Sequence, residues 1–206
     1  MRRLLSGIAA VGLLAIATGG IASAGEPDEV GIAASSSVVV NEVSTRGPNG
    51  VLDDFIEIRN ITNAPVDLSN YQIKVYSQAN TLLETITVPE GVVLQPRGNL
   101  GQFLVVTSQN FSGTVQDETY LLPAVFTGEG IPSRGGVAIF GPSGTKIDGV
   151  AFSTSASTPR EGAAALSETV VTEPLAASSA RDILSTDTDN NRMDFSLHLR
   201  TPGAMN

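Results

Sequence analysis

The sequence contains no cysteine, no tryptophan and a single histidine among its 206 residues. The absence of cysteine excludes disulfide bonds, thiolate metal sites and cysteine nucleophiles. Aromatic residues make up only 5% of the chain. Few rings are therefore present for the stacking platforms that bind carbohydrates or single-stranded nucleic acids.

Basic residues are also few, since 12 lysines and arginines face 21 acidic residues and the net charge is −9. An electrostatic field of this sign repels nucleic acids and anionic membrane surfaces, so we expect neither as a partner. Apolar residues form 41% of the chain, which is enough for a hydrophobic core without disulfides. The length fits one domain plus a leader.

The first 24 residues are predicted to be a secretory signal peptide. Arg2 and Arg3 form its charged start, an apolar run spans Ile8–Ile21, and Ala-Ser-Ala at 22–24 suits a signal peptidase. Cleavage would make Gly25 the first residue and take the net charge to about −11. The run is too weak for a transmembrane anchor and no other segment reaches membrane length, so no membrane span is expected after cleavage. We therefore expect a secreted, extracellular protein, with bacteria as its source.

Three parts of the chain are expected: the signal peptide at 1–24, a flexible linker at 25–37 and one domain at 38–206. The linker is acidic and then rich in small polar residues. Within the domain, nine short segments show β-branched composition or alternating polarity between turn signals. They are Val38–Val43, Phe55–Asn60, Tyr71–Tyr76, Leu83–Val88, Val92–Leu94, Phe103–Thr107, Val137–Phe140, Lys146–Phe152 and Phe195–Leu199.

These segments predict an all-β fold, a sandwich or barrel of about eight to nine short strands. Alternation predicts a set of buried apolar side chains: Ile56, Ile58, Ile73, Val75, Val105, Ile139 and Phe152. Two stretches, Asn110–Arg134 and Ser153–Ser179, show no strand pattern and are expected to be loops. A single turn at Gly162–Ser167 is the one helical candidate.

Three blocks in order resemble the lamin-tail domain. The first runs from VVVNEV through FIEIRN to TNAPVDLSN, the second is the hairpin GGVAIFGPSGTKIDGVAF, and the third is DTDNN with DF and TPGAMN near the end. The resemblance covers about Val38 to Asn206, although Asn110–Arg134 shows no family pattern. It implies an immunoglobulin-like β-sandwich that serves as a binding or structural module, often attached to exported enzymes.

Three groups of residues are candidate sites. Asp187, Asp189 and Asn191 have the alternate spacing that begins a calcium loop, but Arg192 stands where such loops need glycine and His198 where they need glutamate. These three residues are weak candidate metal ligands, and the alternative is a turn held by side-chain-to-backbone hydrogen bonds. Glu42 and Glu57 could form a glycosidase pair, but no aromatic-lined cleft is indicated. His198 lacks a nucleophile motif around it.

A structural ion pair is predicted between Asp148 and Arg181. In KIDGVAF, alternation places Asp148 on the side of Val150 and Phe152, which should face the core unless Gly149 marks a bulge. A buried carboxylate is costly unless it is paired, and Arg181 lies in a segment that the family resemblance places against the sandwich.

The sequence therefore predicts a secreted, non-catalytic interaction module with no cofactor, calcium excepted. The partner would be a protein or a cell-surface component, and the oligomeric state stays open. Two alternatives remain: an accessory docking subunit of an exported hydrolase or nuclease, and a calcium-dependent adhesion domain. No catalytic residue is expected.

Overall fold

The computed structural model describes residues 34–206, so the predicted signal peptide at 1–24 and most of the predicted linker lie outside the described residues. The elements are the strands β1 (Val38–Ser44), β2 (Phe55–Asn60), β3 (Val66–Asp67), β4 (Gln72–Tyr76), β5 (Leu82–Thr87), β6 (Val93–Leu94), β7 (Phe103–Thr107), β8 (Tyr120–Pro123), β9 (Gly136–Phe140), β10 (Lys146–Ala151), β11 (Ala177–Ala180) and β12 (Ser196–Leu199), the 3-10 turn η1 (Glu173–Leu175) and the one-turn helix α1 (Asn191–Asp194).

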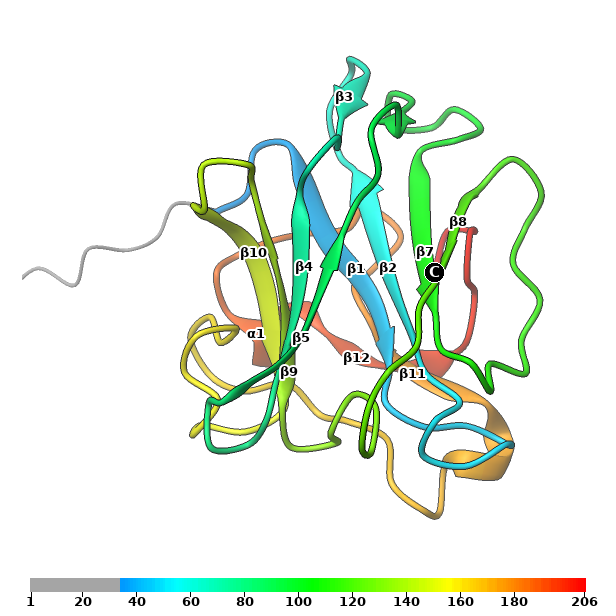
Figure 1. Cartoon of the computed structure of the whole chain (residues 1–206), viewed down its shortest axis with the longest axis vertical. Coiled ribbons are helices and arrows are strands. Elements are labelled where there is room, and N and C mark those ends of the chain that lie inside the picture. Colours follow the sequence, from blue (N-terminus) through cyan, green and yellow to red (C-terminus); the bar gives the residue numbers. More distant parts are fainter. Residues whose placement is uncertain (1–33) are drawn as a thin grey trace, which may run out of the picture. The chain divides into compact units, whose positions relative to one another are not determined.

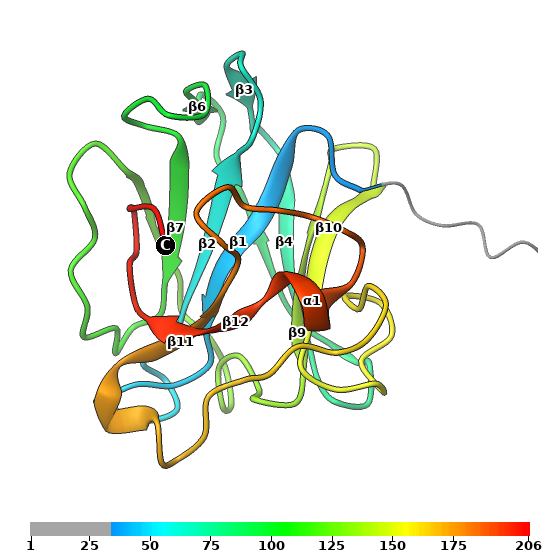
Figure 2. The same ribbon diagram turned by 180° about the vertical axis from the view of Figure 1, so that it is seen from behind.

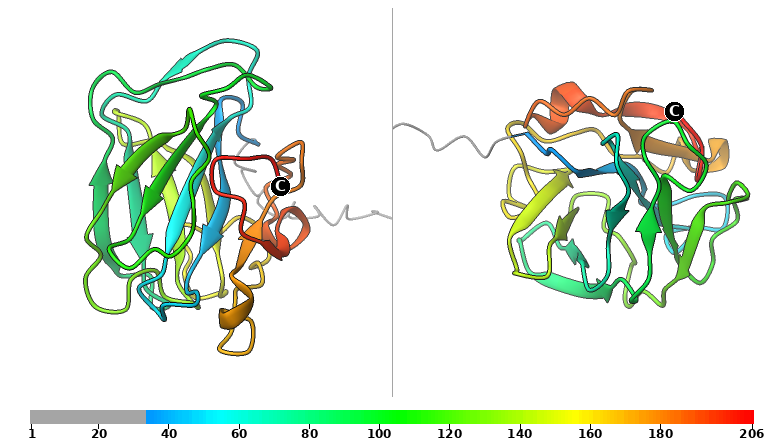
Figure 3. Two further views of the ribbon diagram at one scale, coloured as in Figure 1. Left: turned by 90° about the vertical axis from the view of Figure 1, so that its right-hand side faces the viewer. Right: turned by 90° about the horizontal axis from the view of Figure 1, so that it is seen from above.

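Two sheets pack face to face as an immunoglobulin-like sandwich (Figures 1 and 3). One has the order β12-β11-β1-β2-β7-β8 and the other β10-β9-β4-β5, while β3 and β6 form a separate two-stranded ribbon. All strand pairs are antiparallel except β7 and β8. The all-β prediction is thus confirmed.

The hydrophobic core lies between the two sheets. β-Branched and aliphatic side chains from alternate positions meet there, including Val40, Ile58, Ile73 and Ile139. All seven residues predicted to be buried are buried. Val105 is buried on the opposite side of β7 from the core, because its neighbours Leu104 and Val106 belong to the core cluster and Val105 does not.

Each of the nine predicted segments overlaps a strand, but three strands were missed. They are β3, β8 and β11. β8 corrects the prediction that Asn110–Arg134 is a loop. It is an edge strand that pairs in parallel with β7 and ends at Pro123. Because it is largely exposed, its residues show no alternation of polar and apolar side chains. β11 has the sequence ASSA, lies partly within the supposed loop Ser153–Ser179, and is built from small residues buried on both faces.

The helical content also differs from the prediction. Gly162–Ser167 is not helical, whereas η1 and α1 form in places where no helical turn was expected. The helix α1 begins after Asn190, whose side chain accepts a hydrogen bond from the backbone N–H of Arg192 and caps the turn.

The C-terminal segment, from β11 through α1 and β12 to Asn206, lies along the outer side of β1 and β2 (Figures 2 and 3). The chain end lies near β7 in Figure 2. In the connection between β7 and β8, the backbone N–H of Gln116 donates to the carbonyl of Pro202. Consequently β1 and β2 are buried on both faces, and every residue of each is buried. This covered outer face holds most of the buried polar groups described below.

Candidate functional site

Arg181 is the centre of a buried charged cluster, and it has no exposed surface. Its Nη2 atom lies 3.0 Å from Oδ1 and 3.1 Å from Oδ2 of Asp148. Its Nη1 atom lies 3.1 Å from Oδ2 of Asp194 and 3.3 Å from Oδ1 of Asp187. The guanidinium also stacks on Phe195, with the ring centroid 4.5 Å away. The predicted pair of Asp148 and Arg181 is therefore confirmed, and two further carboxylates share the cation.

Backbone groups of β1 that β11 leaves unpaired hold this ion pair in place. β11 pairs with β1 only at Glu42 and Val43, so Val40 has no strand partner on that side. The backbone N–H of Val40 donates to Oδ2 of Asp148 at 2.6 Å, and its carbonyl accepts from Nε of Arg181 at 3.0 Å. The two charged side chains thus take the place of a neighbouring strand.

Asp148 points inward because the strand register is regular from that residue onward. The irregularity in the pairing of β10 with β9 lies between Lys146 and Asp148, and Gly149 pairs normally with Ala138. Gly149 is needed for a different reason, since a Cβ there would lie 2.4 Å from the carbonyl oxygen of Pro159. That close approach lets the loop after β10 fold back and carry Glu161 to the cluster.

Glu161 is a member of this cluster that the sequence did not reveal. Its Oε1 lies 3.0 Å from Nζ of Lys146, whereas Oε2 is buried without a hydrogen-bond partner. Burial and the neighbouring charge of Asp148 raise the pKa of Glu161 to about 9. The residues that surround Glu161 are distant from it in the sequence, so no local sequence motif predicts its place in the cluster.

The three predicted calcium ligands lie in different surroundings. Asn191 is buried, and its Oδ1 accepts from the backbone N–H groups of Ala151 and Glu161 while its Nδ2 donates to the carbonyl of Gly149. Asp189 adopts a left-handed backbone and donates its N–H to Oδ1 of Asp187. Asp194 holds the same loop through the N–H and hydroxyl of Thr188.

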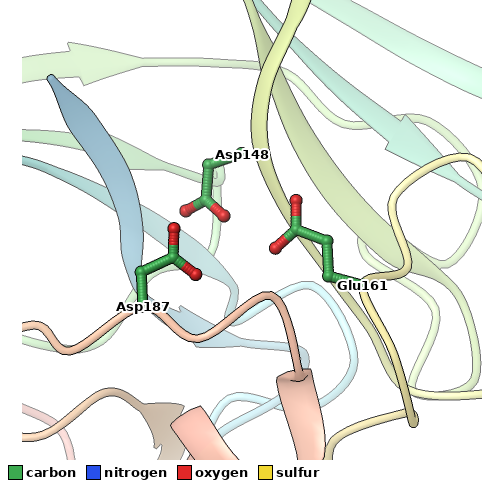
Figure 4. Close-up of side chains that lie close together, drawn as sticks. All are labelled: Asp148, Glu161 and Asp187. Carbon is green, nitrogen blue, oxygen red and sulfur yellow. The ribbon is translucent and has the colours of Figure 1, made fainter. Parts of the chain in front are cut away.

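One carboxylate from this stretch does meet other acids. Oxygens of Asp148, Glu161 and Asp187 lie within 4.8 Å of one another, and Figure 4 shows the three carboxylates converging from three separate segments. Among the described residues, this is the one group of three or more histidine, cysteine, aspartate or glutamate side chains with that geometry.

Glu42 and Glu57, considered as a catalytic pair, are cross-strand neighbours on the covered outer face. Glu42 accepts hydrogen bonds from the hydroxyl of Ser178 and from Thr201, and Glu57 accepts from Asn41 Nδ2 and the backbone N–H of Gly203. Burial raises the pKa of both carboxyls, and the charge of Glu42 raises that of Glu57 further. Both are fully buried beneath the C-terminal segment.

Two adjacent acids before β2 lie in opposite environments. Asp53 accepts from Arg200 at 2.9 Å and from Ser112, and these hydrogen bonds outweigh burial and lower its pKa. Asp54 accepts from the backbone N–H of Ile131, has one unpartnered buried oxygen, and has a pKa that burial raises to about 8. Glu168, bonded to Thr45, has a pKa raised by burial to about 6.

His198 is exposed on β12, and its Nε2 lies 2.8 Å from the hydroxyl of Ser196. A shallow recess of about 380 Å³ lies near the same strand, and its lining includes Pro48, Leu175, Leu199, Arg200 and Pro202. Leu175 and Leu199 are 62% and 70% exposed, so they form the apolar part of its surface. We name it the Leu175–Leu199 recess.

Comparison with known protein families matches residues 32–154 to the Lamin Tail Domain, over more than half of the chain. That family consists of immunoglobulin-like domains without a catalytic function. The match stops before β11, yet β11 and β12 continue the six-stranded sheet. No curated protein matches the sequence. Within residues 34–206, no helix has the length and apolar character to cross a bilayer.

Proposed function

The chain belongs to the lamin-tail domain family, and from that membership we propose that it is a secreted, non-catalytic interaction module that binds a protein. The single observation that carries the non-catalytic part is the burial of its candidate catalytic carboxylates. Glu42 and Glu57 have no exposed surface and accept hydrogen bonds from the protein's own groups. A substrate could reach them only if the C-terminal segment moved away.

The Leu175–Leu199 recess is the proposed contact surface. Its two leucines are largely exposed at the η1 and β12 ends of the covered side. Arg200 also lines the recess, but its side chain is only 4% exposed and its guanidinium binds Asp53 and Ser44 within the protein. Exposed apolar side chains that gather at one place on a surface are typical of a protein interaction site. The net charge of −9 disfavours nucleic acid as the ligand.

Export is the second part of the proposal, and it has its own test. Residues 1–24 carry the charge, apolar run and small residues of a signal peptide. We expect protein recovered from the medium of a bacterium expressing the full chain to begin at Gly25, by N-terminal sequencing or intact mass. Recovery only of cell-associated protein with Met1 intact would contradict export.

The interaction is tested by capture with the protein purified from cells that express the full chain. The bait would be exposed to the medium and envelope fraction of the source organism. A variant with Leu175→Asp and Leu199→Asp should lose at least about tenfold of a specific partner. The matched control is Leu100→Asp, because Leu100 is 73% exposed and does not line the recess. Equal capture by all three proteins would contradict the proposed surface.

Activity is tested separately. Hydrolysis of polysaccharides or nucleic acids by the purified chain, abolished by Glu42→Gln or Glu57→Gln, would overturn the non-catalytic proposal. A captured partner that is itself an exported hydrolase or nuclease would favour the narrower role of a docking subunit.

A further inference from the structure

We propose that Asp148, Glu161 and Asp187 form a binding site for a divalent cation that prefers oxygen ligands, namely calcium. The three carboxylates come from β10, from the loop after it and from the loop before α1 (Figure 4). Their nearest oxygens lie within 4.8 Å of one another. Calcium binds oxygen at about 2.4 Å, so two of its ligands can be up to about 4.8 Å apart. The spacing of the three carboxylates is therefore within the reach of one calcium ion.

An unsatisfied oxygen points to a ligand here. The Glu161 side chain is only 3% exposed, and its Oε2 atom has no hydrogen-bond partner. Its carboxylate is directed toward Asp148 in Figure 4. A buried carboxylate oxygen without a donor is destabilising, because it has lost water and gained nothing in return. A cation between Glu161 and Asp148 would supply the missing interaction.

The charges in the cluster leave room for a divalent ion. Four carboxylates, on Asp148, Glu161, Asp187 and Asp194, share the two cations Arg181 and Lys146. When all are ionised, the cluster holds two more negative than positive charges. At neutral pH the raised pKa of Glu161, about 9, leaves a proton on its carboxyl that removes one of them. Calcium would displace this proton and balance both charges.

The existing hydrogen bonds leave lone pairs for the ion. Oδ1 of Asp148 accepts only from Arg181, and Oδ2 of Asp187 accepts only from the backbone N–H of Ser35. A carboxylate oxygen has two lone pairs, so each can also bind a metal. Ser35 also donates its hydroxyl to the carbonyl of Ile147, so an ion here would join β10, the C-terminal segment and the start of the domain.

This site differs from the one that the sequence predicted. It shares Asp187 with that loop but replaces Asp189 and Asn191 by Asp148 and Glu161. The amide oxygen of Asn191 already accepts two backbone hydrogen bonds, and these hold the Glu161 backbone in position. Asn191 therefore orients a ligand. The backbone N–H of Asp189 donates to Asp187, but its side chain makes no hydrogen bond to the three carboxylates, so a change of that side chain is the control.

The first test uses the purified full chain after chelation, with thermal unfolding measured as calcium is added. We expect a dissociation constant of about 0.1–1 mM and a rise in Tm of about 4 °C at 10 mM calcium, with sodium chloride of equal ionic strength as the blank. No rise in Tm and no heat of binding by calorimetry would overturn the proposal.

Variants distinguish the two candidate sites. Glu161→Gln should remove the calcium response, and its amide can donate to Asp148 so that the fold is retained. Asp189→Asn should keep the response. The reverse result, with loss in Asp189→Asn and retention in Glu161→Gln, would assign calcium to the other loop and overturn the proposal.

A measurement on the unaltered protein guards against misfolding of the Glu161→Gln variant. In a calcium titration followed by amide NMR, the largest shift changes should occur at Gly149 and Gly162, which flank the proposed ligands in sequence. Largest changes at Asp189 and Arg192, with Gly149 and Gly162 unmoved, would contradict the site.

Discussion

The two faces of β1 and β2 are equally buried but chemically unlike. The inner face carries Val40, Ile56 and Ile58, which pack into the core between the sheets. The outer face carries Asn41, Glu42, Glu57 and Arg59, which lie under the C-terminal segment. One strand pair thus separates an apolar layer from a polar layer.

The comparison shows two ways of stabilising a buried surface. Apolar packing is non-directional and tolerates changes of similar volume. A buried polar layer needs a specific partner for each charge, because a carboxylate or guanidinium without one is strongly destabilising. Arg59, for example, donates to Gln102, Ser185 and the carbonyl of Ile183. The outer layer therefore depends on segments that are distant in sequence.

Removal of Arg181 should have the largest effect. Arg181→Ala leaves Asp148 and Asp194 buried without their cation and should lower the free energy of unfolding by about 3–5 kcal/mol. Urea unfolding of the variant and the parent measures this loss. The control is the double variant Arg181→Leu with Asp148→Leu, which should recover part of it. A loss below about 1 kcal/mol in Arg181→Ala would show that the cluster is not a tightly packed ionic site.

A substitution on the inner face should lower the free energy of unfolding somewhat less, through lost packing and not through an unpaired charge. Ile58→Ala removes a fully buried side chain and should cost about 3 kcal/mol, whereas Ile58→Val should cost about 1 kcal/mol. Because no charge is involved, the loss should follow the volume removed, with Ile58→Val far milder than Ile58→Ala, and should be the same at low and high salt. Urea unfolding of both variants at two sodium chloride concentrations measures this, and a strongly salt-dependent loss for Ile58→Ala would break the contrast between the faces.

The inner face was predictable from sequence, and the outer face was only partly so. Alternation and β-branching identified Ile56, Ile58 and Ile73, because a residue's own strand decides which side it faces. The same alternation marks Glu57 and Arg59 as outward, which is correct. What it cannot show is that a segment more than a hundred residues later covers them.

The charged cluster shows the same division. The pair of Asp148 and Arg181 was predictable, because an acid on a core-facing position requires a cation. Glu161 was not, since its place depends on a loop that packs against Gly149. The small-residue strand β11 was missed for a related reason: its residues have no β-branched side chains, and its pairing with β1 and β12 is non-local.

The smallest effect concerns the pH dependence of stability, and adjacent acids give opposite signs. Asp54 has a pKa raised to about 8 by burial, so the folded state binds its proton more tightly than the unfolded state. Its contribution to stability is therefore full below the unfolded pKa near 4 and is lost as the pH rises toward 8. Asp53 has a lowered pKa, so its contribution is present above pH 4 and is lost as the pH falls.

Asp54→Asn should therefore flatten the fall in stability between pH 5 and pH 8, a slope of at most about 1.4 kcal/mol per pH unit for one group. Asp53→Asn is the matched control, because it should leave most of that slope intact and weaken the pH dependence mainly below about pH 4. The charge of Asp53 is only a minor cause of the raised pKa of Asp54. Urea midpoints at single-unit pH steps for the parent and both variants measure the two slopes.

Glu168, with a pKa of about 6 and a charge that raises the pKa of Asp54, titrates in the same window. Glu168→Gln should therefore remove a second part of the slope. An unchanged slope in Asp54→Asn would mean that Asp54 is ionised in the folded state, and that its unpartnered oxygen has a donor, such as a buried water, after all.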